Sequence, residues 1–326
     1  MRGTTPALAV LTSGGDSPGM NAGLRAIVRA AAFRGIQVYG VRHGFRGLVE
    51  GHLVPLNLGS VGNIIQRGGT FLGSSRCPEF HRASIRRVAF DHLKAHGISG
   101  LIALGGDGTL TGAKIFSREF PVRVIGIPCT IDNDLNGTDL AIGFDSAVNT
   151  AVEAIDKIRD TADSHGRVFL IEVMGRNTGH LALETALAVG AEFVVIPEIP
   201  FRPQDLVQKV QAGIQRGKTG SIVIVAEKGQ PGRVLSLAKT LQKHVKRDVR
   251  SVILGHLQRG GAPTRLDRNL GSRMGALAVD LFCARKNRVM VGLEKGQLKA
   301  QSFDKVLSRR HSSRSDDYRL VNILSI

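Results

Sequence analysis

The chain has 326 residues, of which 42% are hydrophobic, and carries a formal net charge of +17. This length predicts two domains. No apolar run approaches the ~20 residues that span a bilayer, and the first residues lead straight into a strand, so we expect a soluble, cytoplasmic protein without a membrane partner. The three cysteines lack CxxC spacing, which indicates neither a disulfide framework nor a zinc site.

The positive charge favours anionic partners, and phosphorylated small molecules would satisfy it. Nucleic acid would satisfy it too, but two tyrosines and no tryptophan argue against a stacking surface for single strands.

The first predicted elements are a strand over residues 7–12 and a helix that begins near Met20 and ends near Gly35, its expected C-terminal cap. The apolar stripe of this helix consists of Met20, Leu24, Ile27, Val28 and Ala31. Gly14 and Gly15 lie in the turn between strand and helix. This turn either cradles phosphate at the helix N-terminus or merely connects the two elements.

A strand over 37–41 is followed by a glycine-rich stretch over 44–76, predicted to be irregular. It ends in RGGTFLGSSR, where Arg67 and Arg76 could close over an anionic ligand.

Strands and helices then alternate regularly, which predicts doubly wound, mostly parallel sheets. The expected helices cover 82–96, 109–117, 145–160, 179–189, 203–216, 232–246 and 267–282. The expected strands cover 101–104, 122–127, 168–173, 192–196, 221–226, 250–254 and 288–292.

Two motifs at strand ends form the centre of the predicted site. In GGDGT, glycines at 105, 106 and 108 let backbone amides approach phosphate, and Asp107 suits Mg²⁺. In CTIDND, an extended backbone would point Asp132 and Asp134 to the same side, where one carboxylate could act as a general base. Each motif could instead be a simple turn. That alternative is harder to sustain when both motifs occur one strand apart.

The second half places further polar clusters at or just beyond predicted strand ends, in VMGRNTG, AEKGQPG and VILGHLQRGG. The residues that a ligand would meet there are Met174, Arg176, Glu227, His256 and Arg259. Arg176 and Arg259, together with Arg167 and Arg250, suit a phosphate monoester, although a lone arginine is more often a surface ion-pair partner.

With these motifs in place, residues 7–292 resemble the bacterial-type ATP-dependent 6-phosphofructokinases. LTSGGDSPGMNA, RGGTFLGSSR, GGDGT, TIDND, VMGR and GHLQRGG occur in the order and spacing of that family. The resemblance implies two α/β/α sandwich domains: a larger nucleotide domain over 1–142 and 257–305, and a smaller sugar-phosphate domain over 143–256 and 306–326. It implies a glycolytic kinase that transfers the ATP γ-phosphoryl group to the 1-hydroxyl of fructose 6-phosphate.

The resemblance also implies residue roles. Asp132 would be the base, Asp107 the Mg²⁺ partner, and Asp134 an orienting carboxylate. The implied ATP-binding residues are Gly14, Arg76, Cys77, Gly105, Gly106, Asp107, Gly108 and Thr109. The implied sugar-phosphate residues are Thr130, Asp132, Arg167, Met174, Gly175, Arg176, Glu227, Arg250, His256 and Arg259, with Thr130 and Arg176 also catalytic.

In this family Arg167 and Arg250 would come from a neighbouring subunit, which implies a homo-oligomer, typically a tetramer, with shared active sites. An allosteric effector site would consist of Arg25, Arg29, Arg159, Glu192, Arg216 and Lys218. Leu58 stands where an arginine is usual in that site, so we expect weak effector control.

Three alternatives stay open. Pyrophosphate could be the donor, but Gly108 and Cys129 stand where pyrophosphate-using relatives carry an acidic residue and a lysine. The chain could be a non-catalytic polyanion binder, or its acceptor could be tagatose 6-phosphate or sedoheptulose 7-phosphate.

Overall fold

The computed structural model describes residues 6–229, 231–308 and 315–325, which form two compact units. Unit 1 contains the described residues of 1–130, 135–145 and 259–311, and unit 2 those of 131–134, 146–258 and 312–326. The predicted domain boundaries stay a prediction.

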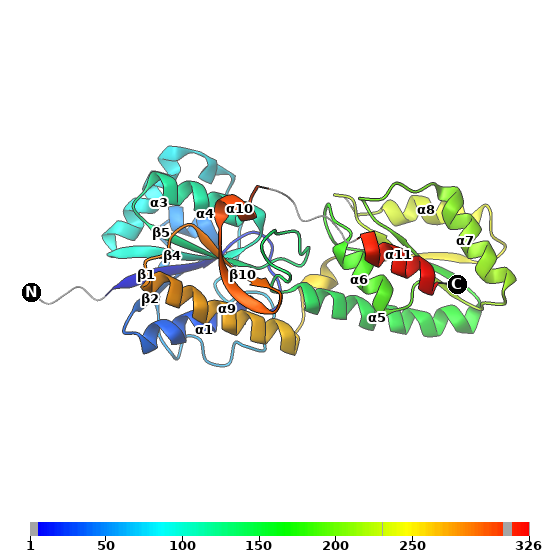
Figure 1. The fold of residues 1–326 in the computed structure, drawn as a ribbon, viewed down its shortest axis with the longest axis horizontal. Helices are drawn as coiled ribbons and strands as arrows, with labels where there is room; N and C mark the ends of the chain where they lie inside the picture. Colours follow the sequence, from blue (N-terminus) through cyan, green and yellow to red (C-terminus); the bar gives the residue numbers. More distant parts are fainter. Residues whose placement is uncertain (1–5, 230, 309–314, 326) are drawn as a thin grey trace, which may run out of the picture. The chain divides into compact units, whose positions relative to one another are not determined.

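Unit 1 is built on a seven-stranded sheet with the order β11-β10-β5-β4-β1-β2-β3 (Figure 1). Its strands are β1 (Ala7–Thr12), β2 (Gln37–Val41), β3 (Leu53–Leu56), β4 (Ile98–Gly105), β5 (Arg123–Pro128), β10 (Val289–Glu294) and β11 (Gln297–Ser302). The five inner strands are parallel, and the two edge strands β3 and β11 are antiparallel to their neighbours.

Helices cover both faces of this sheet, because side chains of each parallel strand alternate between two apolar cores. The helices of unit 1 are α1 (Met20–Phe33), α2 (Gly44–Val49), the 3₁₀ turn η1 (Pro78–His81), α3 (Ala83–Ala95), α4 (Asp107–Glu119), α9 (Arg265–Cys283) and α10 (Phe303–Val306). In β1, Leu8 and Val10 face α1 and α9, whereas Ala9 and Leu11 face α3 and α4.

Helices α1 and α9 pack with their backbones in close approach at three glycines. A Cβ atom on Gly275 would lie 2.6 Å from the carbonyl oxygen of Gly23 and 2.8 Å from the Cβ atom of Ala26. A Cβ atom on Gly271 would lie 3.1 Å from the amide nitrogen of Gly23. The helix that follows the first glycine-rich turn is thus held directly against α9.

Replacing Gly275 with valine is expected to force α1 and α9 apart and lower the free energy of unfolding by about 2 kcal/mol or more. Urea unfolding measures this loss. The matched control is Ala276→Val, one position along at a half-buried site. Equal unfolding midpoints for the two variants would contradict this account of the packing.

Unit 2 contains a four-stranded parallel sheet with the order β7-β8-β6-β9. Its strands are β6 (Val168–Val173), β7 (Phe193–Val195), β8 (Ser221–Ala226) and β9 (Val249–Ile253). Its helices are α5 (Phe144–His165), whose first two residues belong to unit 1, α6 (His180–Ala188), α7 (Pro203–Gln215), α8 (Arg233–Gln242), the 3₁₀ turn η2 (Gly255–Arg259) and α11 (Ser315–Leu324). Helices α7 and α8 share an apolar core with β6, β7 and β8.

The predicted alternation is confirmed, with β6 and β8 at their predicted bounds. Gly35 follows α1 with a φ of 67°, as expected of a C-terminal cap. The prediction of an irregular segment over 44–76 is wrong in part, because α2 and β3 lie within it. No helix among the described parts of the chain is both long and apolar enough to cross a membrane.

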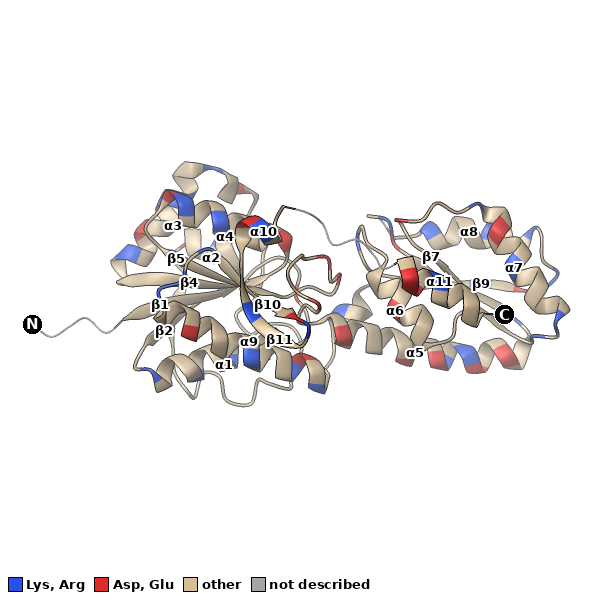
Figure 2. Cartoon of the chain, viewed as in Figure 1, with Lys and Arg blue, Asp and Glu red and all other residues tan. Residues whose placement is uncertain are grey.

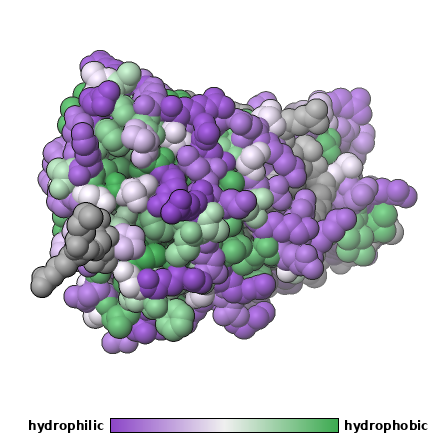
Figure 3. All heavy atoms as spheres, turned by 60° about the vertical axis from the view of Figure 1, so that its left-hand side comes forward, coloured by the Kyte–Doolittle hydropathy of each residue, from purple (hydrophilic) through white to green (hydrophobic). Residues whose placement is uncertain are grey.

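The charges are unevenly distributed between the units. Most of the excess of lysine and arginine lies in unit 1, whereas basic and acidic residues nearly balance in unit 2 (Figure 2). Figure 3 shows one face on which hydrophilic residues surround scattered apolar ones. Phe33, at the end of α1, is 91% exposed.

Candidate active site

The turns after β1, β4 and β5 meet at one edge of the unit 1 sheet, because these strands are parallel neighbours. The amide of Ser13 donates to the carbonyl of Leu104 at 3.0 Å, and the amide of Cys129 donates to the carbonyl of Gly105 at 3.1 Å. The hydroxyl of Thr109 donates to the carbonyl of Ser13 at 2.9 Å. These bonds join the TSGGD, GGDGT and CT segments into one surface.

Two glycines of the GGDGT turn serve different purposes. A Cβ atom on Gly105 would lie 2.5 Å from the carbonyl oxygen of Ser13 and 2.4 Å from the hydroxyl of Thr109, so the packing of the turns requires glycine there. A Cβ atom on Gly108 would meet no atom within 4 Å. Gly108 therefore leaves open space that a ligand can enter.

Asp107 is exposed in the first turn of α4, where the N-terminal end of the helix favours anions. Among the described residues, no three His, Cys, Asp or Glu side chains gather as a metal site. Mg²⁺ is commonly held by one or two carboxylates together with substrate phosphates, so a single exposed carboxylate beside a phosphate cradle fits this ion.

The RGGTFLGSSR loop is fixed onto the same surface by Asn21 at the start of α1. The amide nitrogen of Asn21 donates to the carbonyls of Arg67 and Gly68 at 3.0 and 3.2 Å, and its oxygen accepts from the amide of Phe71 at 2.9 Å. Asn21 is buried and was not predicted as a site residue, although it lies within the LTSGGDSPGMNA motif.

The same loop bonds to the first glycine turn near its other end. The hydroxyl of Ser74 donates to the carbonyl of Gly14. Arg76 and Cys77 follow directly. Arg76 is exposed, and burial raises the pKa of the half-buried Cys77 thiol, which therefore stays protonated near neutral pH. The structure thus places all predicted nucleotide residues in unit 1.

The TIDND segment is not an extended strand. Its backbone bends at Ile131 and Asp132, and Asn133 has a left-handed φ of 49°. The same-side arrangement predicted for Asp132 and Asp134 depended on an extended backbone, which this segment lacks. Asp132 is 6% exposed, whereas Asp134 is half-buried.

Cys129, just before the segment, is buried, and burial raises the pKa of its thiol well above the usual value.

In unit 2, the turn after β6 contacts both the TIDND segment and the end of β8. The hydroxyl of Thr178 lies 3.2 Å from the carbonyl of Asp132 and also 3.2 Å from that of Gly175. The amide of Arg176 donates to a carboxylate oxygen of Glu227 at 3.0 Å. Both Gly175 and Arg176 have positive φ, at 141° and 54°. Asp132 and Glu227 thus contact the same turn, which contains Arg176.

Gln258 supports this cluster and was not singled out from the sequence. It is fully buried, and its side-chain oxygen accepts from the amide of Met174 at 2.8 Å. His256, two residues earlier in η2, is exposed. The only signal for Gln258 was its place within GHLQRGG.

Arg259 belongs to unit 1 and not to the cluster in unit 2. Its guanidinium donates to the carbonyl of Asp16 at 3.0 Å, and a Cβ atom on Gly15 would lie 2.4 Å from it. This arginine therefore packs on the first glycine turn.

Arg167 and Arg250 lie at the opposite edge of the unit 2 sheet. Arg167 directly precedes β6, whereas Met174 directly follows it, and six strand residues span about 20 Å. Both arginines pair with one carboxylate oxygen of Asp248, at 3.1 and 2.8 Å. Within unit 2 they do not lie with Met174 and Arg176.

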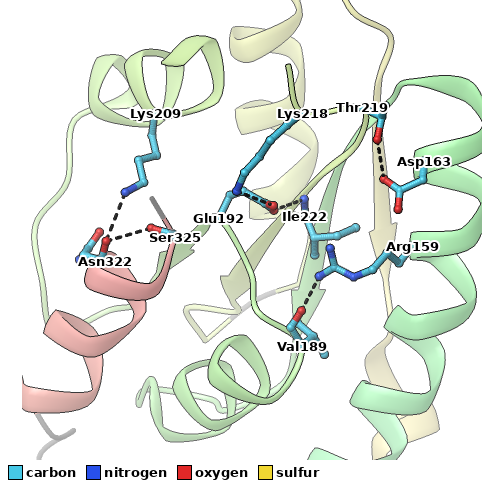
Figure 4. A network of polar contacts seen from close by, with 10 residues as sticks. All are labelled: Arg159, Asp163, Val189, Glu192, Lys209, Lys218, Thr219, Ile222, Asn322 and Ser325. Carbon is cyan, nitrogen blue, oxygen red and sulfur yellow. Dashed lines mark hydrogen bonds and ion pairs between the residues drawn. The ribbon is translucent and has the colours of Figure 1, made fainter. Parts of the chain in front are cut away.

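The predicted effector residues fall in both units, with Arg25 and Arg29 on α1 and the other four in unit 2. Lys218 lies 3.3 Å from one carboxylate oxygen of Glu192, and the other oxygen accepts from the amide of Ile222 at 2.6 Å (Figure 4). Arg159 donates to the carbonyl of Val189.

Lys209, on α7, contacts α11 in the same unit. Its ammonium lies 3.4 Å from the carbonyl of Asn322 (Figure 4). Burial lowers the pKa of Lys209, as do the positive charges of Arg216 and Lys218. These three cations therefore lie near one another.

Residues 7–282 match the phosphofructokinase family. The chain belongs to that family. It is 50% identical, over 98% of its length and 99% of the relative's, to the ATP-dependent 6-phosphofructokinase of Staphylococcus carnosus.

Family members of known structure share the fold. The phosphofructokinase of Pichia pastoris in the T-state has 34% identity and a TM-score of 0.89 over 94% of this chain, which spans 36% of that longer chain. The pyrophosphate-dependent phosphofructokinase of Marinobacter aquaeolei has 23% identity and a TM-score of 0.85, over 96% of this chain and 88% of the other. The last likeness concerns the fold alone.

Proposed function

We infer that this chain is an ATP-dependent 6-phosphofructokinase, which phosphorylates fructose 6-phosphate in glycolysis. The observation that carries this function is the 50% identity to enzymes of that name along nearly the whole chain. Initial rates of phosphoryl transfer to fructose 6-phosphate, with ATP and pyrophosphate compared as donors, test it. As a glycolytic enzyme, it is proposed to act in the cytoplasm.

We propose that the nucleotide lies on the unit 1 surface formed by the three strand-end turns. Gly14 and residues 105–109 would approach the phosphates with backbone amides, and Arg76 would add a guanidinium. Asp107 would hold Mg²⁺ together with the phosphates. The bound ion would neutralise charge on the transferring group.

On the acceptor side, Asp132 is proposed as the base that accepts the proton of the sugar 1-hydroxyl. Thr130 would position the acceptor and Asp134 would orient the base. The guanidinium of Arg176 would stabilise charge on the phosphoryl group. Its backbone already bonds to Glu227, which the resemblance assigns to the sugar. Met174, Gly175 and His256 would complete the sugar site in unit 2, and the resemblance assigns Arg259 of unit 1 to the sugar phosphate as well.

Replacing Gly108 with aspartate is expected to reduce kcat/KM for ATP by about tenfold or more, since ~1.4 kcal/mol of crowding and charge repulsion suffices for that loss. The space around Gly108 is open, so the fold itself should tolerate the change. Gly108→Ala is the matched control, with ATP kinetics near those of the unmodified chain. Unchanged ATP kinetics in the aspartate variant would refute our account of donor choice.

The complete active unit is proposed to be a homotetramer with shared sites. The position of Arg167 and Arg250, one strand length from Met174, supports this proposal, because another subunit would have to supply them to a sugar phosphate bound there.

Effector control is proposed to be weak. Leu58 replaces one phosphate-binding arginine of the family's effector site, and Lys218 is paired with Glu192. Initial rates titrated with ADP or phosphoenolpyruvate should therefore change little. A strong, saturable and cooperative response to either effector would show that the site works without that arginine.

A further inference from the structure

Basic side chains line the edge of the unit 1 sheet at which its parallel strands begin. This edge lies opposite the turns of the candidate active site, because parallel strands start at one edge and end at the other. We name the following residues the amino-edge patch: Phe33, Arg34, His96, Arg123, Arg285 and Arg288. Arg288 directly precedes β10, Arg123 begins β5, His96 shortly precedes β4, and Arg34 shortly precedes β2.

The register of the sheet sets the spacing of the patch. The amide of Arg288 donates to the carbonyl of Val124, and Ala7 of β1 pairs with both Ile98 and Gln37. Neighbouring strands are ~4.8 Å apart, so the row from β10 to β2 extends for about 20 Å. Successive nucleotides of a single strand can follow a row of this length.

Arg123, on the second strand of the row, is held in place by its contacts. Its guanidinium donates to the carbonyl of Phe282 at 2.9 Å and to the hydroxyl of Ser99 at 3.2 Å, and lies 4.1 Å from the centroid of the Phe282 ring. Burial lowers its pKa, as does the nearby positive charge of Arg285. Two guanidinium groups therefore lie near each other.

Three arginines of the patch form no close ion pair. In the described part of the chain, no ion pair involves Arg123, Arg285 or Arg288. Three carboxylates near this edge have other partners: Asp280 pairs with Arg34, Glu119 with Arg86, and Asp304 with Lys114 and Arg118. The hydrogen bond to Lys114 lowers the pKa of Asp304, as does the positive charge of Arg288, so Asp304 partly compensates Arg288. Arg285 and Arg288 both have a φ of 55°, an uncommon conformation for long side chains.

Phe33 adds an aromatic ring to this basic edge. It is 91% exposed at the C-terminal end of α1, beside Arg34, whose bond to Asp280 places it next to the end of α9. Arg285 follows five residues after Asp280. An exposed ring on an edge that also carries arginines without a close ion pair is a combination that can bind single-stranded nucleic acid, by base stacking and phosphate contact.

We propose that the amino-edge patch binds single-stranded nucleic acid, with a base stacked on Phe33 and phosphates held by Arg123, Arg285 and Arg288. The composition argued against stacking because tryptophan and tyrosine are scarce, but the structure exposes a phenylalanine for this purpose. The patch is separate from the strand-end turns of unit 1. It therefore functions independently of phosphoryl transfer.

Fluorescence anisotropy with labelled oligouridine and oligothymidine tests the proposal on the full chain. The Arg285→Asn/Arg288→Asn variant suits both positions, because asparagine tolerates positive φ. It should bind at least tenfold more weakly. For this variant, the slope of log affinity against log salt concentration should also be shallower, by about 0.7 for each lost phosphate contact. Equal affinity for the two oligonucleotides would indicate that RNA and DNA bind to the patch in the same way. A higher affinity for oligouridine would indicate that the patch prefers RNA.

Phe33→Ser should weaken binding about tenfold without changing the salt dependence, because stacking releases no counter-ions. The matched charge control is Lys243→Asn/Lys246→Asn, which removes two exposed cations of unit 2. All variants should keep their kinase activity and oligomeric mass. The proposal is overturned if the control loses as much affinity, if Phe33→Ser binds normally, or if Phe33→Ser changes the mass and so identifies a subunit contact.

Discussion

Replacing Asp132 with asparagine is expected to lower kcat by about 10² to 10⁴-fold, the range that general base catalysis contributes. Asparagine keeps the shape of the side chain but cannot accept the proton of the sugar hydroxyl. KM for fructose 6-phosphate should change little, because the proposed role concerns the transition state. Steady-state kinetics of the purified variant measures both quantities.

Asp139→Asn provides the control for Asp132→Asn. Asp139 is an exposed carboxylate of unit 1 that accepts from the amide of Lys295 at 2.7 Å, outside all proposed contacts with substrate. Its replacement should leave kcat unchanged. A variant at Asp132 with normal kcat and greatly raised KM would contradict the base assignment and leave only a binding role.

The second large effect is expected at Arg167 and Arg250, which lie at the edge of the unit 2 sheet where its strands begin. Replacing both Arg167 and Arg250 with serine should raise KM for fructose 6-phosphate by about 100-fold, because hydrogen bonds to charged groups are worth about 1.5–3 kcal/mol each. KM for ATP should stay near its original value. Both side chains are partly exposed, so little loss of stability is expected.

Mixing this variant with Asp132→Asn tests whether active sites are shared. A hybrid oligomer contains sites in which an intact Asp132 on one subunit meets intact arginines from another. Co-expression should therefore restore activity above that of either parent. The rates are compared at a fructose 6-phosphate concentration far below the KM of the arginine variant, where both parents are slow. If the hybrids are no faster than their parents there, the arginines do not act between subunits.

The sequence predicted the regular elements well where strong periodicity and turn residues coincide. β6 and β8 were correct at both ends because mostly apolar runs rich in β-branched residues are bounded by polar turns. The helix α2 and strand β3 were missed because glycines recur along that stretch, and the pairing of β3 with β2 is not visible in a local pattern.

For the site, the sequence located the motifs but not the contacts that support them. Asn21, Thr178 and Gln258 fix loops through bonds to distant backbone groups, which no local pattern reveals. The left-handed Asn133 likewise follows from its surroundings. Glu172 is a further example, since this buried carboxylate accepts from the amides of Gly232 and Val234 at the start of α8.

The most direct test of the account measures initial rates of phosphoryl transfer to fructose 6-phosphate with Mg²⁺, using ATP and pyrophosphate at matched concentrations. We expect turnover with ATP and none with pyrophosphate, because Gly108 leaves room for a nucleotide and Cys129 provides no positive charge. Turnover with pyrophosphate alone would contradict the donor assignment, and the absence of turnover with either donor would contradict the proposed function itself.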